Sequence, residues 1–415
     1  MQRKKVFEGV KVIDFSWVLT GPQATRELAE HGATVVRVES HKRIDTLRAV
    51  APYRDGKPGI DRTAFGAMPN TNKYGISLNL NTPKGQEIAR KLVRWADVVV
   101  ESMTPGTMKR WGLDYEACQK MNPGIIYFST CQMGQYGPQA EYGGYGGHAA
   151  AVSGFMSICG WPDWDPVLVY GAYIDYVAPW YLATDLIGAL LYRHRTGKGM
   201  CLDQAQMESG ASFLGPALLD YAVNGRVAGR MGNRDPYAAP HSVYPCRGSG
   251  RWVAVGVYID EEWQAFCRVL GHPDWTRNPR FATLLSRKEN EDELDALVAE
   301  WTRGYLAEEV MTLMQGAGVA AGVSQTTEDL LEYDPQLKHR QHFVELKHKV
   351  IGLHSYRAPA YKLSKTPAEL HKAGPCLGED NEHVYKDIVG LSDDEMAELM
   401  AAGIITTEAD LPGAA

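Results

Sequence analysis

The sequence predicts an α/β protein built on a parallel, doubly wound β-sheet. Over roughly the first 130 residues, short apolar runs rich in β-branched side chains alternate with amphipathic segments. This alternation is typical of repeated β-α-β units. Glycine, proline and capping residues separate the segments at spacings that suit strands and helices. In sheets of this kind, ligands bind beyond the carboxyl ends of the strands.

Five segments are expected to be buried parallel strands, because each is short, apolar and rich in valine, isoleucine or aromatic residues. They are residues 10–15, 34–39, 76–80, 98–100 and 125–128.

The helices between these strands are predicted from residue types that are common where helices begin and end. A helix over 24–31 is closed by Gly32, a residue type common just after helices. Thr82 followed by Pro83 is the pattern of an N-cap and a first helical position.

Beyond residue 150 the pattern becomes more helical. We expect a helix over 183–196 that ends at the turn 196–199, and a change of domain around 225–250, where glycine, asparagine, arginine and proline accumulate. Ser392, with Glu395 three residues later, predicts a capping box that opens a final helix. The remaining predictions are a strand over 251–258 and helices over 261–270, 288–303 and 306–317.

Composition narrows the class of protein. The formal charge of −7 argues against broad binding to nucleic acid or to anionic membranes. The seven cysteines are irregularly spaced and form no CxxC pair, which favours a reduced, cytoplasmic setting. No apolar run approaches the length of a membrane span. The basic residues Arg3, Lys4 and Lys5 are not followed by the apolar region of a signal peptide.

Common motifs of metal and cofactor sites are missing. His339 and His342 have no cysteine or acidic partner at ligand spacing, so no metal is expected. The segment 14–22 lacks GxGxxG, and 197–199 lacks the full P-loop frame. The nucleophile motif GxSxG of the α/β hydrolases is also absent.

Asp175 is the most unusual carboxylate, because it lies inside the apolar and aromatic run 169–177. Burying an unpaired carboxylate is costly, and such groups often have a raised pKa and a chemical role. Asp175 is therefore a candidate nucleophile or general base. The structural alternative is an N-cap for a helix that starts near Pro179.

A series of short segments, in order along residues 9–405, resembles one enzyme family. Among them are 9–15 with Gly21-Pro22, 31–39, 72–80, 96–101, 112–115, 134–138, 193–199, 278–282, 317–322, 334–337 and 374–379. Taken together, these segments resemble the class III (CaiB/BaiF-type) CoA-transferases. This family includes formyl-CoA:oxalate and carnitine CoA-transferases and the related α-methylacyl-CoA racemases.

The resemblance implies a covalent role for Asp175, which stands eighteen residues before Arg193 as the family's catalytic aspartate does. Its carboxylate would attack an acyl-CoA to form an aspartyl anhydride, and the CoA thiolate would return to make an aspartyl-CoA thioester. A carboxylic acid acceptor would then take the CoA through a second anhydride. Thioester energy is conserved, so no bound cofactor or metal is required.

The resemblance also implies ten contacts with coenzyme A, which is a substrate here. Val18 and Leu19 fall where the backbone meets the nucleotide, and Arg110 falls at the CoA phosphates. Gly144 and Tyr145 fall near the pantetheine arm. The segments that contact the pyrophosphate and adenine contribute Leu78, Asn81, Ser102, Met103 and Thr104.

Two departures from the family bear on function. A basic residue expected after the second strand is Ser40, although residues 41–43 are basic and offer substitutes. The racemase branch needs a histidine where Tyr145 stands, and His148 is three residues away. Transferase is therefore favoured over a 2-methylacyl-CoA racemase or epimerase. A partner-dependent, CoA-binding subunit of a hetero-oligomeric transferase is a third hypothesis.

The fold that the resemblance implies is a Rossmann-like large domain with a smaller α+β domain. We expect the large domain over 1–225, the small domain over 226–330, and a segment over 331–415 that returns to the large domain. Family members form interlocked rings, so an interlocked homodimer, or a heterodimer with a homologous subunit, is expected.

The acceptor acid is predicted from the rings around Asp175. If they line the acyl pocket, a bulky or aromatic acid fits better than formate or oxalate. Transfer of the succinyl-CoA:benzylsuccinate type is one such reaction. The rings are Trp161, Trp164, Tyr170, Tyr173, Tyr176 and Trp180.

Overall fold

A computed structural model describes residues 5–406 and residue 410. The sequence analysis predicts no signal peptide at the N-terminus, and residues 1–4 of that segment lie outside the described residues. The chain divides into two compact units. The first comprises residues 1–155, 168–225 and 338–415, and the second comprises residues 156–167 and 226–337.

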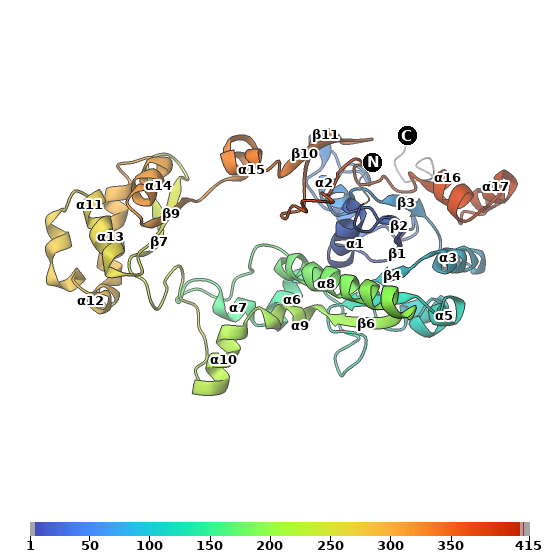
Figure 1. Cartoon of the computed structure of the whole chain (residues 1–415), viewed down its shortest axis with the longest axis horizontal. Coiled ribbons are helices and arrows are strands. Elements are labelled where there is room, and N and C mark those ends of the chain that lie inside the picture. Colours follow the sequence, from blue (N-terminus) through green and yellow to red (C-terminus); the bar gives the residue numbers. More distant parts are fainter. Residues whose placement is uncertain (1–4, 407–409, 411–415) are drawn as a thin grey trace. The chain divides into compact units, whose positions relative to one another are not determined.

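The first unit is built on a six-stranded sheet in the order β3-β2-β1-β4-β5-β6 (Figure 1). Every neighbouring pair in it is parallel, which confirms the predicted sheet type. The strands are β1 (Lys11–Asp14), β2 (Thr34–Glu39), β3 (Tyr74–Ser77), β4 (Val98–Glu101), β5 (Ile126–Cys131) and β6 (Met200–Ala205).

Both faces of this sheet are covered by helices, as a doubly wound sheet requires. Val12, Val98 and Phe128 point into a core with α1 (Thr20–Glu30) and α8 (Tyr173–Thr196). Their neighbours along the strands, such as Ile13 and Val99, point into the opposite core. That core is completed by α3 (Pro83–Trp95), α5 (Tyr115–Met121) and α17 (Asp393–Ala401).

Several helix ends form as the sequence predicts. The Thr82 side chain accepts a hydrogen bond from Gly85 N at 3.1 Å at the start of α3. Gly197 closes α8 in the left-handed conformation, with φ of 71°. Ser392 and Glu395 form the expected capping box at α17.

Helix α8 begins ten residues earlier than the predicted range of 183–196, and it carries Pro179 in its interior. The alternative prediction, that Asp175 is the N-cap of a helix starting near Pro179, is therefore wrong. Asp175 lies in the first turn of α8, and Ala172 is the N-cap.

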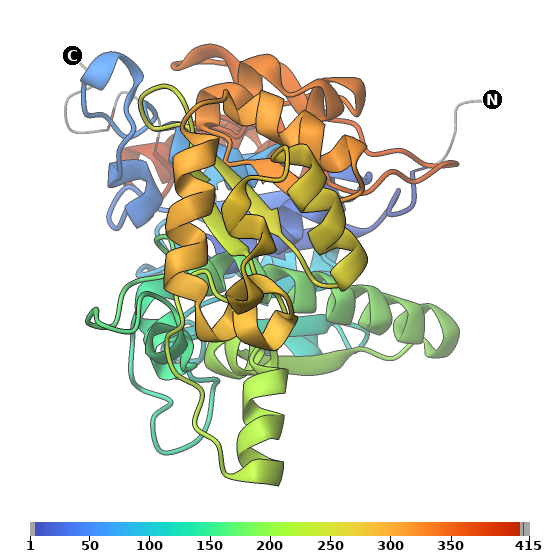
Figure 2. The same cartoon turned by 90° about the vertical axis from the view of Figure 1, so that its left-hand side faces the viewer.

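The second unit contains an antiparallel three-stranded sheet, β7 (His241–Pro245), β8 (Trp252–Gly256) and β9 (Ala320–Val323). Figure 2 shows its helices, in yellow and orange, packed around these strands. The helix predicted over 288–303 is two helices with a break at Asn290. The four helices are α11 (Asp260–Val269), α12 (Leu284–Glu289), α13 (Glu291–Thr302) and α14 (Ala307–Gly316).

The shorter elements complete the description. A hairpin, which the sequence analysis did not predict, pairs β10 (Phe343–His348) with β11 (Gly352–Arg357). The other helices are α2 (Ala64–Ala67), α4 (Thr107–Arg110), α6 (Gly146–Val152), α7 (Phe155–Ile158), α9 (Gln206–Ser212), α10 (Gly215–Asn224), α15 (Pro335–His339) and α16 (Asn381–His383).

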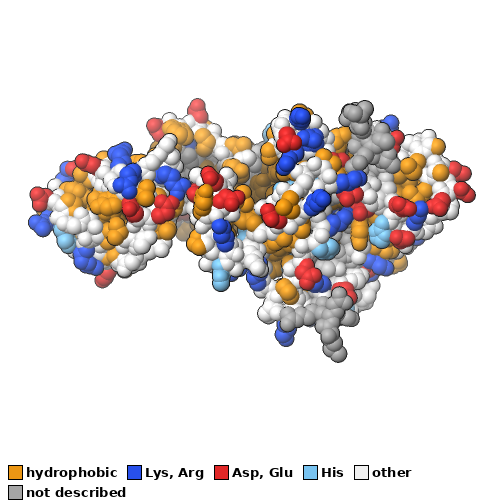
Figure 3. All heavy atoms as spheres, turned by 90° about the horizontal axis from the view of Figure 1, so that it is seen from above, with side chains coloured by type: hydrophobic (Ala, Val, Ile, Leu, Met, Phe, Trp, Pro, Cys, Tyr) orange, Lys and Arg blue, Asp and Glu red, His pale blue; other side chains and the backbone are white. Residues whose placement is uncertain are grey.

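Within the described residues, no helix has the length and hydropathy needed to cross a membrane. The same part of the chain holds no cluster of three or more His, Cys, Asp or Glu side chains suited to a metal ion. All seven cysteines are described, and none forms a disulfide. On the face seen in Figure 3, acidic and basic side chains are interspersed.

Candidate active site

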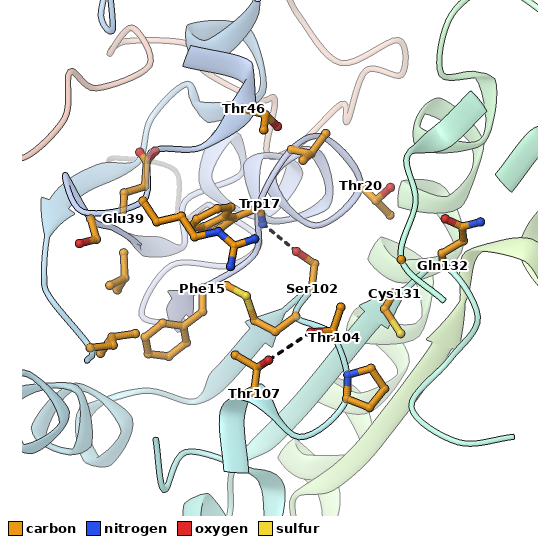
Figure 4. Close-up of a pocket in the computed structure, with 18 of the residues that line it drawn as sticks. Phe15, Trp17, Thr20, Glu39, Thr46, Ser102, Thr104, Thr107, Cys131 and Gln132 are labelled. Atoms are coloured by element: carbon orange, nitrogen blue, oxygen red, sulfur yellow. Dashed lines mark hydrogen bonds between the residues drawn. The ribbon is translucent and has the colours of Figure 1, made fainter. Parts of the chain in front are cut away.

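A cavity of about 770 Å³ lies at the carboxyl edge of the parallel sheet, in the first unit. Segments that follow each of the six strands contribute to it, which is where doubly wound sheets bind ligands. Its size lies within the range of small-molecule and cofactor sites. The cavity contains apolar, polar and charged side chains; Figure 4 shows part of its lining.

The predicted catalytic residue and the ten predicted CoA contacts, eleven residues in all, line this one cavity. They come from six separate stretches of the chain, and the fold brings them together. They are Val18, Leu19, Leu78, Asn81, Ser102, Met103, Thr104, Arg110, Gly144, Tyr145 and Asp175.

The loop after β1 forms one wall and is held by side chains from elsewhere in the unit. Trp17 N donates to Ser102 Oγ at 2.8 Å, the bond drawn in Figure 4. Val18 N donates to Asp45 Oδ2 at 3.0 Å. These two bonds hold the backbone of the loop at the site.

Val18 has a φ of 62°, a conformation that β-branched residues rarely adopt. The hydrogen bond to Asp45 helps to hold it there, and Asp45 is in turn paired with the buried Arg37. Arg37 also pairs with Glu39 at 3.0 Å, so the loop after β1 is tied to the end of β2. Strained residues of this kind cluster at functional sites, where surrounding structure maintains them.

Asp175 lies at the cavity and is only 5 % exposed. Burial raises the pKa of its carboxyl group from 3.8 to about 6, and hydrogen bonds from the Thr20 hydroxyl and the Gly146 N–H oppose the rise. The carboxylate is therefore poorly solvated but still ionised near neutral pH. That combination suits a nucleophile.

Gly146 is in close contact with this carboxylate. A Cβ atom at Gly146 would stand 2.6 Å from Asp175 Cγ and 2.7 Å from Ala172 Cβ, well inside van der Waals distance. The start of α6 therefore requires glycine at this point.

We expect Gly146→Ala to lower the rate of the CoA transfer that the sequence resemblance implies by about a hundredfold, because displacing a reacting group by about 1 Å has costs of that size. Gly143→Ala is the matched control, since a Cβ there meets nothing within 4 Å. Initial rates of both variants at saturating acyl-CoA make the comparison. Equal rates would contradict the close approach to Asp175.

Glu101, at the end of β4, supports the neighbouring wall. Its carboxylate accepts hydrogen bonds from Met103 N at 2.6 Å and from the Ser129 hydroxyl. Burial raises the pKa of Glu101 to about 7, against the effect of these two bonds. Glu101 itself does not line the cavity, but it positions the segment 102–104, which does.

Three basic side chains lie at the cavity: Lys42, Arg43 and Arg110. Arg43 stacks over the Trp17 ring, with its guanidinium carbon 5.1 Å from the ring centre. Arg110 Nη2 donates to Thr107 Oγ1 at 2.8 Å. Of the basic residues suggested as substitutes at Ser40, Lys42 and Arg43 line the cavity and His41 does not.

Two features that the sequence analysis associates with Asp175 lie elsewhere. None of the six aromatic rings expected around the acyl pocket lines the cavity; its rings are Phe15, Trp17, Trp111, Tyr142 and Tyr145. These six rings therefore give no support to a bulky or aromatic acceptor, which stays a prediction.

His148, the suggested substitute for the racemase histidine, is exposed on α6 and does not line the cavity. Its Nδ1 accepts a hydrogen bond from Tyr145 N at 3.3 Å, in the cap of that helix. The second half of an acid-base pair is therefore not supplied by His148.

The cavity, with its buried carboxylate, can be compared with known proteins. The model of CoA-transferase family III matches residues 7–381. The chain belongs to CoA-transferase family III. Membership confirms that this protein is a CoA-transferase, as the sequence resemblance implies.

Relatives of this family III transferase cover almost its whole length. It is 32 % identical, over 96 % of its own chain and 98 % of the relative, to a succinyl-CoA–D-citramalate CoA-transferase of Chloroflexus aurantiacus. It is 30 % identical, over 98 % of its chain and 91 % of the relative, to a human succinyl-CoA:glutarate CoA-transferase. A CaiB/BaiF family protein of Brucella suis has a similar structure, with a TM-score of 0.84, 28 % identity, and coverage of 93 % of this chain and 100 % of that one.

Thr20 and Glu101 of the family III transferase were not singled out by the sequence analysis. One feature of the sequence could have pointed to Glu101, because it is an acidic residue directly after an apolar segment predicted to be a buried strand. The carboxyl ends of such strands form the ligand-binding edge of a parallel sheet. The indication for Thr20 is weaker: it is a residue with a side-chain hydroxyl just before Gly21-Pro22, at the start of a helix.

Proposed function

We propose that this transferase moves CoA from succinyl-CoA to a small dicarboxylic acid through covalent intermediates on Asp175. The observation that carries the proposal is the cavity itself. It joins a buried, ionisable carboxylate to the ten positions expected to contact CoA, Arg110 among them, and to two further basic side chains, Lys42 and Arg43.

The chemistry follows from the environment of Asp175. A carboxylate oxygen of Asp175 bonds to the thioester carbon, the C–S bond breaks, and the CoA thiolate leaves. The thiolate then attacks Asp175 Cγ and expels the donor acid as its carboxylate. The acceptor carboxylate attacks Cγ of the resulting aspartyl-CoA, the C–S bond breaks, and a second anhydride forms as the thiolate leaves. The thiolate then attacks the acceptor's acyl carbon, which gives the new acyl-CoA and releases Asp175 as its carboxylate. Burial supports this route, since both anhydrides are sensitive to water.

The substrate class rests on the relatives. Two of them are named for succinyl-CoA as donor and for D-citramalate or glutarate as acceptor. The cavity lining gives no support to an aromatic acceptor, because the rings that motivated one lie outside it. We therefore favour a small dicarboxylate over benzylsuccinate.

A panel of acceptors tests this assignment. Purified protein is mixed with succinyl-CoA and one acid at a time: D-citramalate, glutarate, oxalate or benzylsuccinate. Chromatography of the CoA esters should show transfer to D-citramalate or glutarate at the highest kcat/KM. A preference for benzylsuccinate would contradict the proposed acceptor. Deuterium exchange at the α-carbon of a 2-methylacyl-CoA without any acceptor would instead favour racemisation.

We expect Arg110→Met to raise the KM for acyl-CoA by about tenfold or more, with kcat changed less than threefold. A charge-assisted hydrogen bond to a CoA phosphate contributes on the order of 1.5–3 kcal/mol, and it is made equally in the ground and transition states. Lys109→Met is the matched control, because Lys109 is a neighbouring exposed cation that does not line the cavity. A loss confined to kcat in Arg110→Met would argue against a role in CoA binding.

We further propose that the transferase acts as an interlocked dimer with a second copy or a homologous chain. Helix α10 supports this, because it is largely apolar and yet has no buried residue. Leu219 and Tyr221 on it are 65 % and 60 % exposed. Apolar surface of this kind marks protein interfaces. Light scattering should give twice the chain mass, and a monomer with full activity would overturn the proposal.

A further inference from the structure

Thr20 has no role in the assignments made above, yet it stands against the proposed nucleophile. It is the first residue of α1, lines the cavity and is 3 % exposed (Figure 4). Its Oγ1 lies 3.4 Å from Asp175 Oδ1, and the hydroxyl donates to that carboxylate oxygen. Two residues 155 positions apart in the chain thus meet at the reacting group.

The backbone at Thr20 is tightly held, so this contact is built into the fold. Gln23 N donates to Leu19 O at 2.8 Å in the first turn of α1. A Cβ atom at Gly21 would stand 2.3 Å from Ser16 Cβ, which shows how closely this turn packs on the loop after β1. One turn further, Thr25 Oγ1 donates to Asp14 Oδ2 at 2.6 Å.

The geometry points to Thr20 as a catalytic hydrogen-bond donor that stays on Asp175 Oδ1 while Oδ2 makes and breaks bonds. This inference rests on the proposed function, since it assigns a role within the aspartyl route.

The role follows from where charge develops. When the CoA thiolate attacks Asp175 Cγ in the anhydride, the C=O electrons move onto Oδ1. The Cγ–Oδ2 bond then breaks, and the donor acid leaves with Oδ2 as its carboxylate. When the acceptor carboxylate attacks the aspartyl-CoA, charge again develops on Oδ1 before the thiolate departs. Thr20 keeps its proton throughout and donates a hydrogen bond that strengthens in both transition states.

Thr20→Val tests the role, because it removes the hydroxyl and keeps the shape of the side chain. We expect kcat at pH 8 to fall about ten- to a hundredfold. Loss of a well-placed oxyanion donor costs about 10²–10³ in kcat, and the 3.4 Å contact made by Thr20 is longer and therefore weaker. The KM for succinyl-CoA should change less than threefold. Thr20→Ser, which keeps the hydroxyl, should recover most of the loss.

A pH profile separates this role from mere packing. The Thr20 hydrogen bond lowers the pKa of Asp175, so its removal should move the acidic limb of kcat/KM to higher pH. Tyr176, also on α8, is a titratable neighbour whose own pKa Asp175 helps to raise, well above this limb. Thr20→Ser should leave the limb near its original position.

The outcomes distinguish two failures. If Asp175→Asn is inactive but Thr20→Val has the same kcat as the original protein, and the acidic limb of its kcat/KM profile lies at the same pH, the inference is overturned and the proposed function stands. An equal loss in Thr20→Ser and Thr20→Val also overturns it, because the hydroxyl would then not matter. If Asp175→Asn transfers CoA normally, the proposed function itself fails. Thermal melting of each variant checks its fold, and Thr20→Ala replaces Thr20→Val if the latter melts early.

Discussion

Asp175→Asn is expected to abolish CoA transfer while leaving the protein folded and more stable. Removing a nucleophile that acts with its surrounding groups lowers kcat by on the order of 10⁴-fold or more. The amide is nearly isosteric with the carboxylate, so the cavity is preserved. Asp185→Asn, an exposed position on the same helix, is the matched control and should keep full activity.

The gain in stability follows from the raised pKa of Asp175. Because folding raises this pKa from 3.8 to about 6, the ionised carboxylate destabilises the folded state above pH 6, and the cost vanishes below about pH 4. A rise in pKa from 3.8 to about 6 corresponds to a free-energy cost of about 3 kcal/mol at most. Urea unfolding at pH 8 should show Asp175→Asn to be more stable by about 1–3 kcal/mol, with no gain at pH 4. Lower stability at pH 8 would contradict the burial cost.

Lys73→Met is expected to have the largest effect on stability. Lys73 and Asp14 are both fully buried, and Lys73 Nζ donates to Asp14 Oδ2 at 3.0 Å, to Pro22 O at 2.7 Å and to Asn70 Oδ1 at 2.9 Å. Burial opposes ionisation of Asp14, but the charges of Lys73 and Arg37 outweigh it and hold the pKa of Asp14 below its usual value. The substitution leaves that carboxylate buried without its main partner, at a cost of about 3–5 kcal/mol.

The control for Lys73→Met is Lys84→Met, which breaks an exposed pair with Glu87 and should cost less than about 1 kcal/mol. Adding Asp14→Asn to Lys73→Met should recover part of the loss, because the unpaired charge is then gone. Urea unfolding at pH 7 measures the free energy of unfolding of all three variants and of the original protein. A change of under 1 kcal/mol in Lys73→Met would show that the buried pair does not hold the end of β1.

The sequence reveals the parts of the site whose signal is local. Asp175 stands out because an acidic residue interrupts an apolar run, and the strands of the sheet centre stand out because both their faces are buried. The edge strand β6 was missed because it carries Asp203 and Gln204 and alternates in burial, so it lacks a continuous apolar run.

Other features depend on contacts that no local pattern records. The start of α8 was placed too late because Pro179 lies in its interior, and proline usually marks a helix end or start. The contact between Thr20 and Asp175 depends on how α1 packs against α8. The six aromatic residues near Asp175 in sequence are not among the residues that line the cavity, so proximity along the chain is a poor guide to the acyl pocket.

Oxygen labelling tests the covalent route through Asp175 most directly. The protein is incubated with unlabelled succinyl-CoA and succinate carrying ¹⁸O in its carboxylates, then quenched in acid and digested. Each turnover through an aspartyl anhydride leaves an oxygen of the attacking acid on Asp175. The account therefore predicts ¹⁸O in the peptide that contains Asp175, only when succinyl-CoA is present. Exchange of label into succinyl-CoA with no ¹⁸O at Asp175 would contradict it.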